Sequence, residues 1–247
     1  MIVLRSGDEI AKIRTAGKII ASTFKKLKGF VKPGITTQEL DVIAREEILR
    51  LDGYPAFKGY KGYPGNICTS INEAVVHGIP SNRSLKSGDI ISLDVGVKFG
   101  DYFADAAITV GVGRIDDAAT RLIEVTERAL YKGIDNALAG NRLSGVSCAV
   151  QEFVESNGFS VVRAFVGHGI GTKIHEEPEI PNFGRRGIGP KLETGMVLAI
   201  EPMVNTGTHE VEILEDGWTA VTKDRKLSAH FEHTIAVTDG EAQILTR

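Results

Sequence analysis

The chain has 247 residues, of which 42% are hydrophobic, and single domains reach roughly 250 residues before they split, so one sizeable core is expected. Its 29 Lys and Arg residues against 32 Asp and Glu give a net charge of −3 without blocks of like charge, which disfavours binding to nucleic acid or to an anionic membrane. No apolar run approaches the about 18 residues that cross a bilayer, and the apolar start ends at Arg5, so we expect a cytoplasmic protein without a signal peptide.

The two cysteines limit the kinds of metal site that the chain can form. Cys68 and Cys148 are too few for a disulfide framework or a Cys-rich zinc site, and in a reducing compartment both remain thiols. Any metal is therefore expected to be held by histidines and carboxylates.

Two helices are expected first. Capping boxes stand at 6–9 and at 36–39, each with Ser or Thr three residues before Glu. Apolar residues recur at helical spacing after both boxes. The first helix is expected to end at 32–34, where the sequence is Lys-Pro-Gly, and the second at Gly53. A stretch rich in Gly and Tyr, 54–66, follows.

The rest of the chain predicts two further helices and two pairs of strands. Residues 89–97 and 102–110 predict strands joined by a short turn at Phe99-Gly100. The remaining elements are helices at 118–138 and 144–156, and strands at 195–204 and 230–237.

The second half of the sequence repeats the pattern of the first. Segment 85–94 (LKSGDIISLD) aligns with 192–201 (LETGMVLAIE), and Asp105 aligns with Glu232 once an inserted hairpin with Asp216-Gly217 at its tip is allowed for. The order helix, helix, strand, strand therefore occurs twice, and a repeat of this kind reveals architecture that local patterns miss.

This repeat predicts the domain organisation. We expect an α+β fold that forms one catalytic domain, 1–247, with pseudo-symmetric halves of about 1–113 and 114–247 around a shared, mainly antiparallel sheet.

Four acidic residues are paired by the alignment, Asp94 with Glu201 and Asp105 with Glu232. With a two-residue turn at Phe99-Gly100, Asp94 and Asp105 would be cross-strand neighbours with Cβ atoms about 5 Å apart. Like charges opposed on a half-buried sheet are destabilising unless something neutralises them. Two divalent cations would do so, and mainly oxygen ligands suit Mn, Fe, Co or Zn. For any one of these acids alone, a solvated sheet face is the alternative.

Histidines also cluster along the chain. Five of the six lie in three local contexts, His77-Gly-Ile, His168 to His175, and His230-Phe-Glu-His233. A lone His in a Gly-rich segment is often structural, but this clustering favours a site.

Together these segments closely resemble type I methionine aminopeptidases of peptidase family M24, from about residue 6 to the C-terminus. The motifs are Val76-His77-Gly-Ile-Pro80, Asp94 and Asp105 at a spacing of 11, Gly167-His168-Gly-Ile-Gly171, His175-Glu-Glu-Pro178, Glu201-Pro-Met-Val-Asn205, Asp216-Gly-Trp218 and Phe231-Glu-His-Thr234. The first helix begins at once, and only 25 residues separate His175 from Glu201, which leaves no room for the helical insertion of type II enzymes. The resemblance implies the pita-bread fold.

The resemblance also implies a site with two divalent ions (Co, Mn, Fe or Zn) and a set of ligands. These ligands are Asp94, Asp105, His168, Glu201 and Glu232, with Asp105 and Glu232 bridging the ions.

The expected reaction is removal of the N-terminal methionine by a metal-bridging hydroxide that attacks the Met carbonyl, with a preference for a small second residue. In this family's pattern, His77 holds the scissile amide nitrogen, His175 donates to the oxyanion and Glu201 moves the proton. A blocked or formylated terminus is not expected to be a substrate.

A methionine side chain needs an apolar, polarizable pocket. The positions that resemble its walls are Phe57, Tyr60, Tyr63, Cys68, Ile174 and Trp218. Tyr and Trp are more often core or surface residues than pocket walls, which is the alternative here. Phe57, Ile174 and His230 depart from the residues common in the family.

Expected partners follow from the same resemblance. They are peptides and nascent chains with a free N-terminal Met, and the ribosome that presents such chains. The protein itself is expected to be a monomer.

Two alternatives remain. One is a prolidase or X-Pro aminopeptidase of the same fold, but these carry a separate N-terminal domain and lack the segment Tyr60-x-x-Tyr63-Pro64. The other is an inactive relative that serves as a binding module, but such proteins lose ligands, and this chain keeps all five.

Overall fold

The computed structural model describes residues 2–247. Both expected capping boxes form, at Ser6 with Glu9 and at Thr36 with Glu39. The helices are α1 (Gly7–Phe30), α2 (Thr37–Arg50), α3 (Asp117–Asp135) and α4 (Ser144–Ser156), with a short 3-10 turn, η1, at Tyr60–Gly62. The third helix ends three residues before the predicted 138, because the chain tightens at Asn136 and Ala137, whose N–H groups donate to the third residue back.

Most strands belong to one nine-stranded sheet in which every pairing is antiparallel. Its main order is β1-β4-β5-β14-β9-β7-β8, with β2 beside β4 and β15 beside β14. Its strands are β1 (Tyr54–Pro55), β2 (Cys68–Ile71), β4 (Ile90–Phe99), β5 (Tyr102–Gly111), β7 (Val166–Gly169), β8 (Glu176–Pro181), β9 (Val197–Ile200), β14 (Glu232–Ala236) and β15 (Gln243–Ile244).

Two three-stranded sheets complete the fold. One has β13 (Ser228–His230), β10 (Met203–Asn205) and β6 (Ser160–Val161), and the other β11 (Val211–Ile213), β12 (Ala220–Thr222) and β3 (Ala74–Val76). The hairpin β11–β12 is the insertion that the repeat predicts, with Asp216-Gly217 in its loop.

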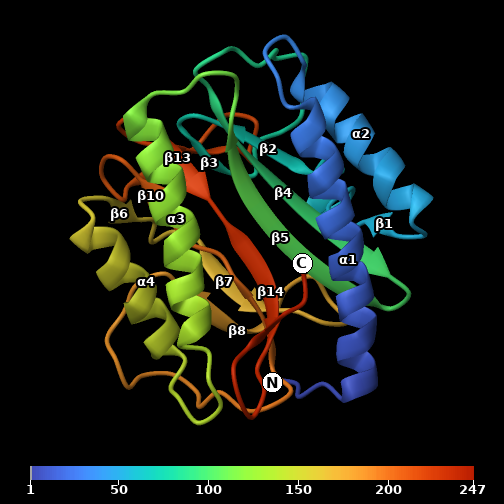
Figure 1. Cartoon of the computed structure of the whole chain (residues 1–247), viewed down its shortest axis with the longest axis vertical. Coiled ribbons are helices and arrows are strands. Elements are labelled where there is room, and N and C mark those ends of the chain that lie inside the picture. Colours follow the sequence, from blue (N-terminus) through green and yellow to red (C-terminus); the bar gives the residue numbers. More distant parts are fainter. Residues whose placement is uncertain (1) are drawn as a thin grey trace.

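The sheet order reflects the repeat. Strands β5 and β14 lie side by side at the centre, and their repeat-related neighbours β4 and β9 flank them on either side. In Figure 1, α1 and α2 lie on one side of these central strands and α3 and α4 on the other. The pseudo-symmetric arrangement brings the two strand pairs that carry the acidic residues together.

The turn between β4 and β5 differs from the prediction. Phe99 pairs with Tyr102, so the loop is Gly100-Asp101 and not Phe99-Gly100. Gly100 has φ of 57°, a left-handed conformation suited to the first central position of a hairpin turn.

This turn sets the register of the two aspartates. Asp94 lies opposite Ala107 and Asp105 opposite Gly96, so the predicted direct pairing of Asp94 with Asp105 is wrong. They are diagonal neighbours, and because the shift is by two residues both still lie on one face of the sheet.

The predicted strands 195–204 and 230–237 are each interrupted. The first ends as β9 before Glu201-Pro202 and resumes as β10, and the second is divided at Phe231 into β13 and β14. At each break the chain passes between the nine-stranded sheet, which contains β9 and β14, and the three-stranded sheet, which contains β10 and β13. Proline has no N–H for the ladder, which favours a break there. His233 pairs with Ile200, and Met203 pairs with His230. The register is therefore continuous across the break and places Glu201 opposite Glu232.

The described residues contain no helix long and apolar enough to cross a membrane. Cys68 and Cys148 are both buried free thiols, as expected.

Candidate metal centre and substrate pocket

One cavity of about 200 Å³ collects nearly all of the predicted site residues. Its lining comprises Phe57, Tyr60, Lys61, Tyr63, Cys68, His77, Asp94, Asp105, His168, His175, Glu201, Trp218 and Glu232. These residues come from both halves of the chain, so the site forms only when the two halves meet across the central sheet.

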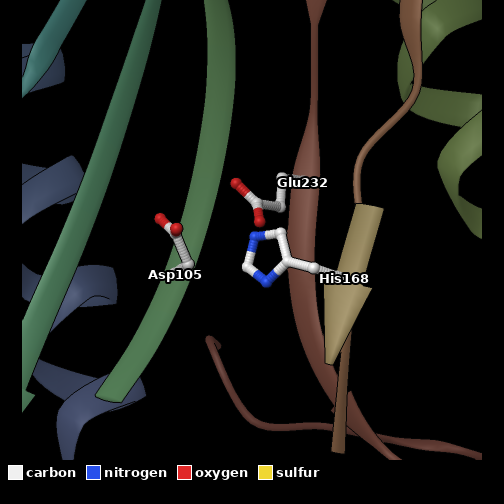
Figure 2. Close-up of side chains that lie close together, drawn as sticks. All are labelled: Asp105, His168 and Glu232. Carbon is white, nitrogen blue, oxygen red and sulfur yellow. The ribbon is translucent and has the colours of Figure 1, made fainter. Parts of the chain in front are cut away.

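Three ligand-type side chains converge at the base of this cavity. Asp105 on β5, Glu232 on β14 and His168 on β7 each offer one atom, and these atoms all lie within 4.8 Å of one another. Figure 2 shows the three side chains pointing toward a common point between their strands. Glu201 joins them, because its Oε1 lies 3.5 Å from Nε2 of His168.

Several carboxylate oxygens of this group lack partners. Among the described residues, Oδ1 of Asp94, Oδ1 of Asp105 and Oε1 of Glu232 are buried and accept no hydrogen bond. A buried, unpaired carboxylate is costly unless a cation or proton compensates it. The donor set therefore fits divalent cations, for which clustered carboxylates with one imidazole are suitable ligands.

The electrostatics of the acids agree with this fit. Burial raises the pKa of Asp94 to about 6. Burial and the negative charge of neighbouring acids raise the pKa values of Asp105 and Glu232 well above their ordinary values, and burial alone does so for Glu201. Without cations these groups keep their protons to a higher pH than ordinary carboxyls do, so we expect metal binding to release protons.

His168 is held in the tautomer that a metal ligand needs. Its Nδ1 lies 2.9 Å from the carbonyl oxygen of Gly169, so Nδ1 carries the proton and Nε2 presents its lone pair to the acids. Burial lowers the pKa of His168 to about 4, so the ring is neutral at pH 7.

His175 and His77 line the same cavity as the acids. Nδ1 of His175 lies 3.0 Å from the hydroxyl of Tyr60, and its ring centroid lies 4.3 Å from that of His168. His77 packs edge-on against Phe165, with ring centroids 5.4 Å apart. Burial lowers the pKa of His77 to about 4 and that of His175 to about 3. Both imidazoles are neutral at pH 7 and each can donate one N–H.

Hydrogen bonds and ring contacts fix two aromatic wall residues, Tyr63 and Trp218. The Tyr63 hydroxyl donates to the carbonyl oxygen of Gly78 at 2.9 Å, and the Trp218 ring meets Tyr63 edge-on with centroids 5.1 Å apart. The carboxylate of Asp216 accepts from the backbone N–H of Trp218 at 2.8 Å, so the tip of the inserted hairpin anchors the backbone of this wall residue.

The structure departs from the predicted wall at one position. Ile174 does not line the cavity and belongs instead to the larger hydrophobic core, where it is buried. The adjacent His175 occupies the cavity side, and one short segment cannot present both side chains there.

Two residues near the site were given no role by the sequence analysis, although His230 was placed in a histidine cluster. Lys61 lines the cavity from the turn η1, and no sequence pattern marks it. His230 lies beside Glu201, with its Nε2 3.6 Å from Oε2 of Glu201. Its place in the histidine cluster beside Glu232 was the available signal.

Comparison with known proteins identifies the family. Residues 11–239 match the model of metallopeptidase family M24. The chain is 54% identical to a methionine aminopeptidase of Clostridium perfringens, covering 100% of this chain and 99% of that protein. It is 53% identical to methionine aminopeptidase 1 of Bacillus subtilis over the full length of both.

Comparison with solved structures supports the same family. A methionine aminopeptidase of Thermotoga maritima superposes with a TM-score of 0.99 at 46% identity, covering 100% of both chains. A prolidase of Pyrococcus furiosus shares only the fold, with a TM-score of 0.78 at 20% identity over 65% of its length. The chain has the pita-bread fold and belongs to metallopeptidase family M24, with the bacterial methionine aminopeptidases of type I.

Proposed function

We propose that this protein is a metal-dependent exopeptidase that removes the N-terminal methionine from peptides and newly made proteins. The observation that carries this proposal is the group of buried, unpartnered carboxylate oxygens beside His168 at the base of a cavity with aromatic walls. The names of relatives at 54% and 53% identity over the full chain support it.

The five predicted residues, Asp94, Asp105, His168, Glu201 and Glu232, would hold two divalent ions. When bound, the ions would supply Lewis-acid polarisation of the scissile carbonyl, a lowered pKa for the attacking water and a positive charge that favours a free α-amine. Co, Mn, Fe and Zn all suit such ligands, and availability decides among them.

His175 and His77 would act on the peptide bond. A neutral His175 whose Nδ1 is held by Tyr60 can donate from Nε2 to the carbonyl oxygen as negative charge develops there, and one such donor contributes about 3 kcal/mol. His77, which also lines the cavity, would hold the scissile amide nitrogen. Glu201 would accept a proton from water and pass it to the leaving amine.

The walls would select methionine. Tyr63, Trp218, Phe57 and Cys68 offer apolar and polarizable surface around a volume of about 200 Å³, which suits one unbranched thioether side chain. A small second residue is expected to be preferred.

The whole chain, 1–247, would act as one catalytic domain and as a monomer in the cytoplasm, on peptides and on nascent chains at the ribosome. The central pairing of β5 with β14 supports the single unit, because each half supplies two of the four acids.

A peptide panel tests this function. We expect Met-Ala-Ser and Met-Gly-Ser to release Met, Met-Leu-Ser to react more slowly, and formyl-Met-Ala-Ser not to react. Rapid cleavage of X-Pro peptides that lack Met would support the prolidase alternative. Tight peptide binding without any cleavage, with metal present, would support the inactive binding module.

A further inference from the structure

The carboxylate of Glu201 lies between two imidazoles. Its Oε1 is 3.5 Å from Nε2 of His168, and its Oε2 is 3.6 Å from Nε2 of His230. Only His168 has its other ring nitrogen engaged, by the Gly169 carbonyl oxygen. Both histidines therefore direct Nε2 at the same carboxylate, but they differ in whether Nδ1 is hydrogen-bonded.

His230 is buried and its ring lacks hydrogen-bond partners. It is 1% exposed, and neither ring nitrogen makes a hydrogen bond with any described residue. An unsatisfied buried polar group costs about 1–3 kcal/mol. One acceptor within reach of Nε2 is Oε2 of Glu201, which lies 3.6 Å away, about 0.4 Å beyond the usual N–H···O range.

The backbone of His230 is anchored. The Thr109 hydroxyl accepts from the His230 N–H at 2.9 Å and donates to the His230 carbonyl oxygen at 2.8 Å. Ser92 on the neighbouring strand lies 2.8 Å from the same hydroxyl. The ring therefore projects toward Glu201 from a fixed point on β13, across the break at which β13 and β14 change sheets.

The two nitrogens that face Glu201 have opposite roles. Nε2 of His168 presents a lone pair, because Nδ1 of that ring carries the proton. A second lone pair on Nε2 of His230 would repel the carboxylate, so this nitrogen is expected to carry a proton and to donate. Glu201 then has one oxygen held by a donor and the other directed toward His168 and the acids.

We propose that His230 is a positioning residue that donates from Nε2 to Oε2 of Glu201 and fixes the orientation in which Oε1 faces the metal centre. This inference rests on the proposed function, because it assigns Glu201 to the ligand set. Groups that orient a metal ligand through a hydrogen bond typically change metal affinity or activity by 10- to 100-fold when removed.

Three variants of the full chain separate positioning from packing. In His230→Gln the side-chain amide reaches about as far as Nε2 of imidazole, whereas in His230→Asn it is one methylene shorter. His230→Leu replaces the imidazole with an apolar side chain of similar size that has no hydrogen-bond donor. His233→Leu is the matched control, because His233 lies on the adjacent strand and contacts Thr246 and Tyr131 instead of Glu201.

The readouts are Mn²⁺ binding to EDTA-treated protein by titration calorimetry, kcat and KM for Met-Ala-Ser, and melting temperature. We expect His230→Asn and His230→Leu to weaken Mn²⁺ binding and lower kcat by about 10-fold or more, with KM within about 2-fold. His230→Gln should remain within about 3-fold of the unmodified protein, and His233→Leu should keep its Mn²⁺ affinity.

Several results would overturn the proposal. If His230→Asn and His230→Leu keep the Mn²⁺ affinity and kcat of the unmodified protein, a positioning role is excluded. Equal losses in the Gln and Asn variants that parallel their melting temperatures would show that the ring serves packing alone. If the unmodified protein neither binds Mn²⁺ nor releases Met, the proposed function fails, and the role of His230 fails with it.

Discussion

The hydroxyl of Tyr60 lies 3.0 Å from Nδ1 of His175, and the two rings stack with centroids 5.3 Å apart. Tyr60 begins the tight turn η1, between Gly59 and Gly62, which both have positive φ. Because the phenol is the stronger acid and the imidazole nitrogen the stronger base, Tyr60 donates. The proton of the neutral imidazole then lies on Nε2, where a donor to substrate is needed.

Tyr60→Phe tests this hydrogen bond while keeping the stacked ring. One hydrogen bond contributes about 1 kcal/mol, so we expect kcat to fall about 5- to 10-fold with unchanged metal content. Steady-state kinetics on Met-Ala-Ser checks this. Tyr54→Phe is the control, because Tyr54 is 64% exposed. An unchanged kcat in Tyr60→Phe would mean that the hydroxyl does not orient His175.

His77→Ala tests the residue proposed to hold the scissile amide. His77 is not one of the five proposed ligands, so metal content should remain as in the unmodified protein while kcat falls about 100-fold. Metal analysis beside kinetics checks both parts. His209→Ala, at an exposed position, should change neither. Loss of metal in His77→Ala would show that His77 is a ligand.

Removal of metal should make stability depend on pH in a defined direction. Between their ordinary and their raised pKa values, Asp105, Glu201 and Glu232 bind more protons in the folded than in the unfolded protein. Their stabilising contribution to the free energy of unfolding is complete at low pH and is lost as pH rises through the raised pKa values. The buried histidines have lowered pKa values and act oppositely, but only below about pH 6.5, where unfolded histidines titrate.

In EDTA we therefore expect the melting temperature to fall from pH 6.5 to pH 8. Mn²⁺ at 100 times its dissociation constant should add about 2.7 kcal/mol, which corresponds to about 5–10 °C in a chain of this size. This Mn²⁺-induced rise in melting temperature should be larger at pH 8 than at pH 6.5. Scanning calorimetry measures it, and equal melting with and without Mn²⁺ at pH 8 would contradict metal-neutralised acids.

Asp41 holds the segment that leads into the pocket wall. Its buried carboxylate accepts from the N–H of Asn66 at 2.7 Å, from Nδ2 of Asn66 at 2.5 Å and from the N–H of Ile67 at 3.1 Å. Asp41→Ala leaves these donors unpaired, so we expect a loss of about 3 kcal/mol in the free energy of unfolding. Denaturant titration measures it. Glu46→Ala, exposed on the same helix, should cost less than about 0.5 kcal/mol.

Helix starts and the pairing of the two halves could be predicted from sequence because local chemistry decides them. The Ser6 and Thr36 capping boxes act within three residues, and the repeat of 85–94 at 192–201 requires equivalent strands. The grouping of Asp105 with Glu232 followed from this repeat, and the structure places their side chains together.

The turn at Gly100-Asp101 could not be derived in the same way. Several adjacent two-residue loops fit the sequence of this hairpin, and the choice depends on how Phe99 and Tyr102 pair. The break after Glu201 was not predicted either. Apolar residues continue through Met203 and Val204, and only the tertiary structure shows that the chain changes sheets there.

Metal stoichiometry tests the central claim most directly. EDTA-treated protein is titrated with Mn²⁺ by calorimetry, and the release of Met from Met-Ala-Ser is measured on the same samples, for the unmodified chain and for Glu232→Gln. We predict two ions per unmodified chain, with Met release that requires them, and weakened Mn²⁺ binding together with loss of Met release in Glu232→Gln. Absence of Mn²⁺ binding to the unmodified chain, or binding and cleavage that Glu232→Gln leaves unchanged, would contradict the account.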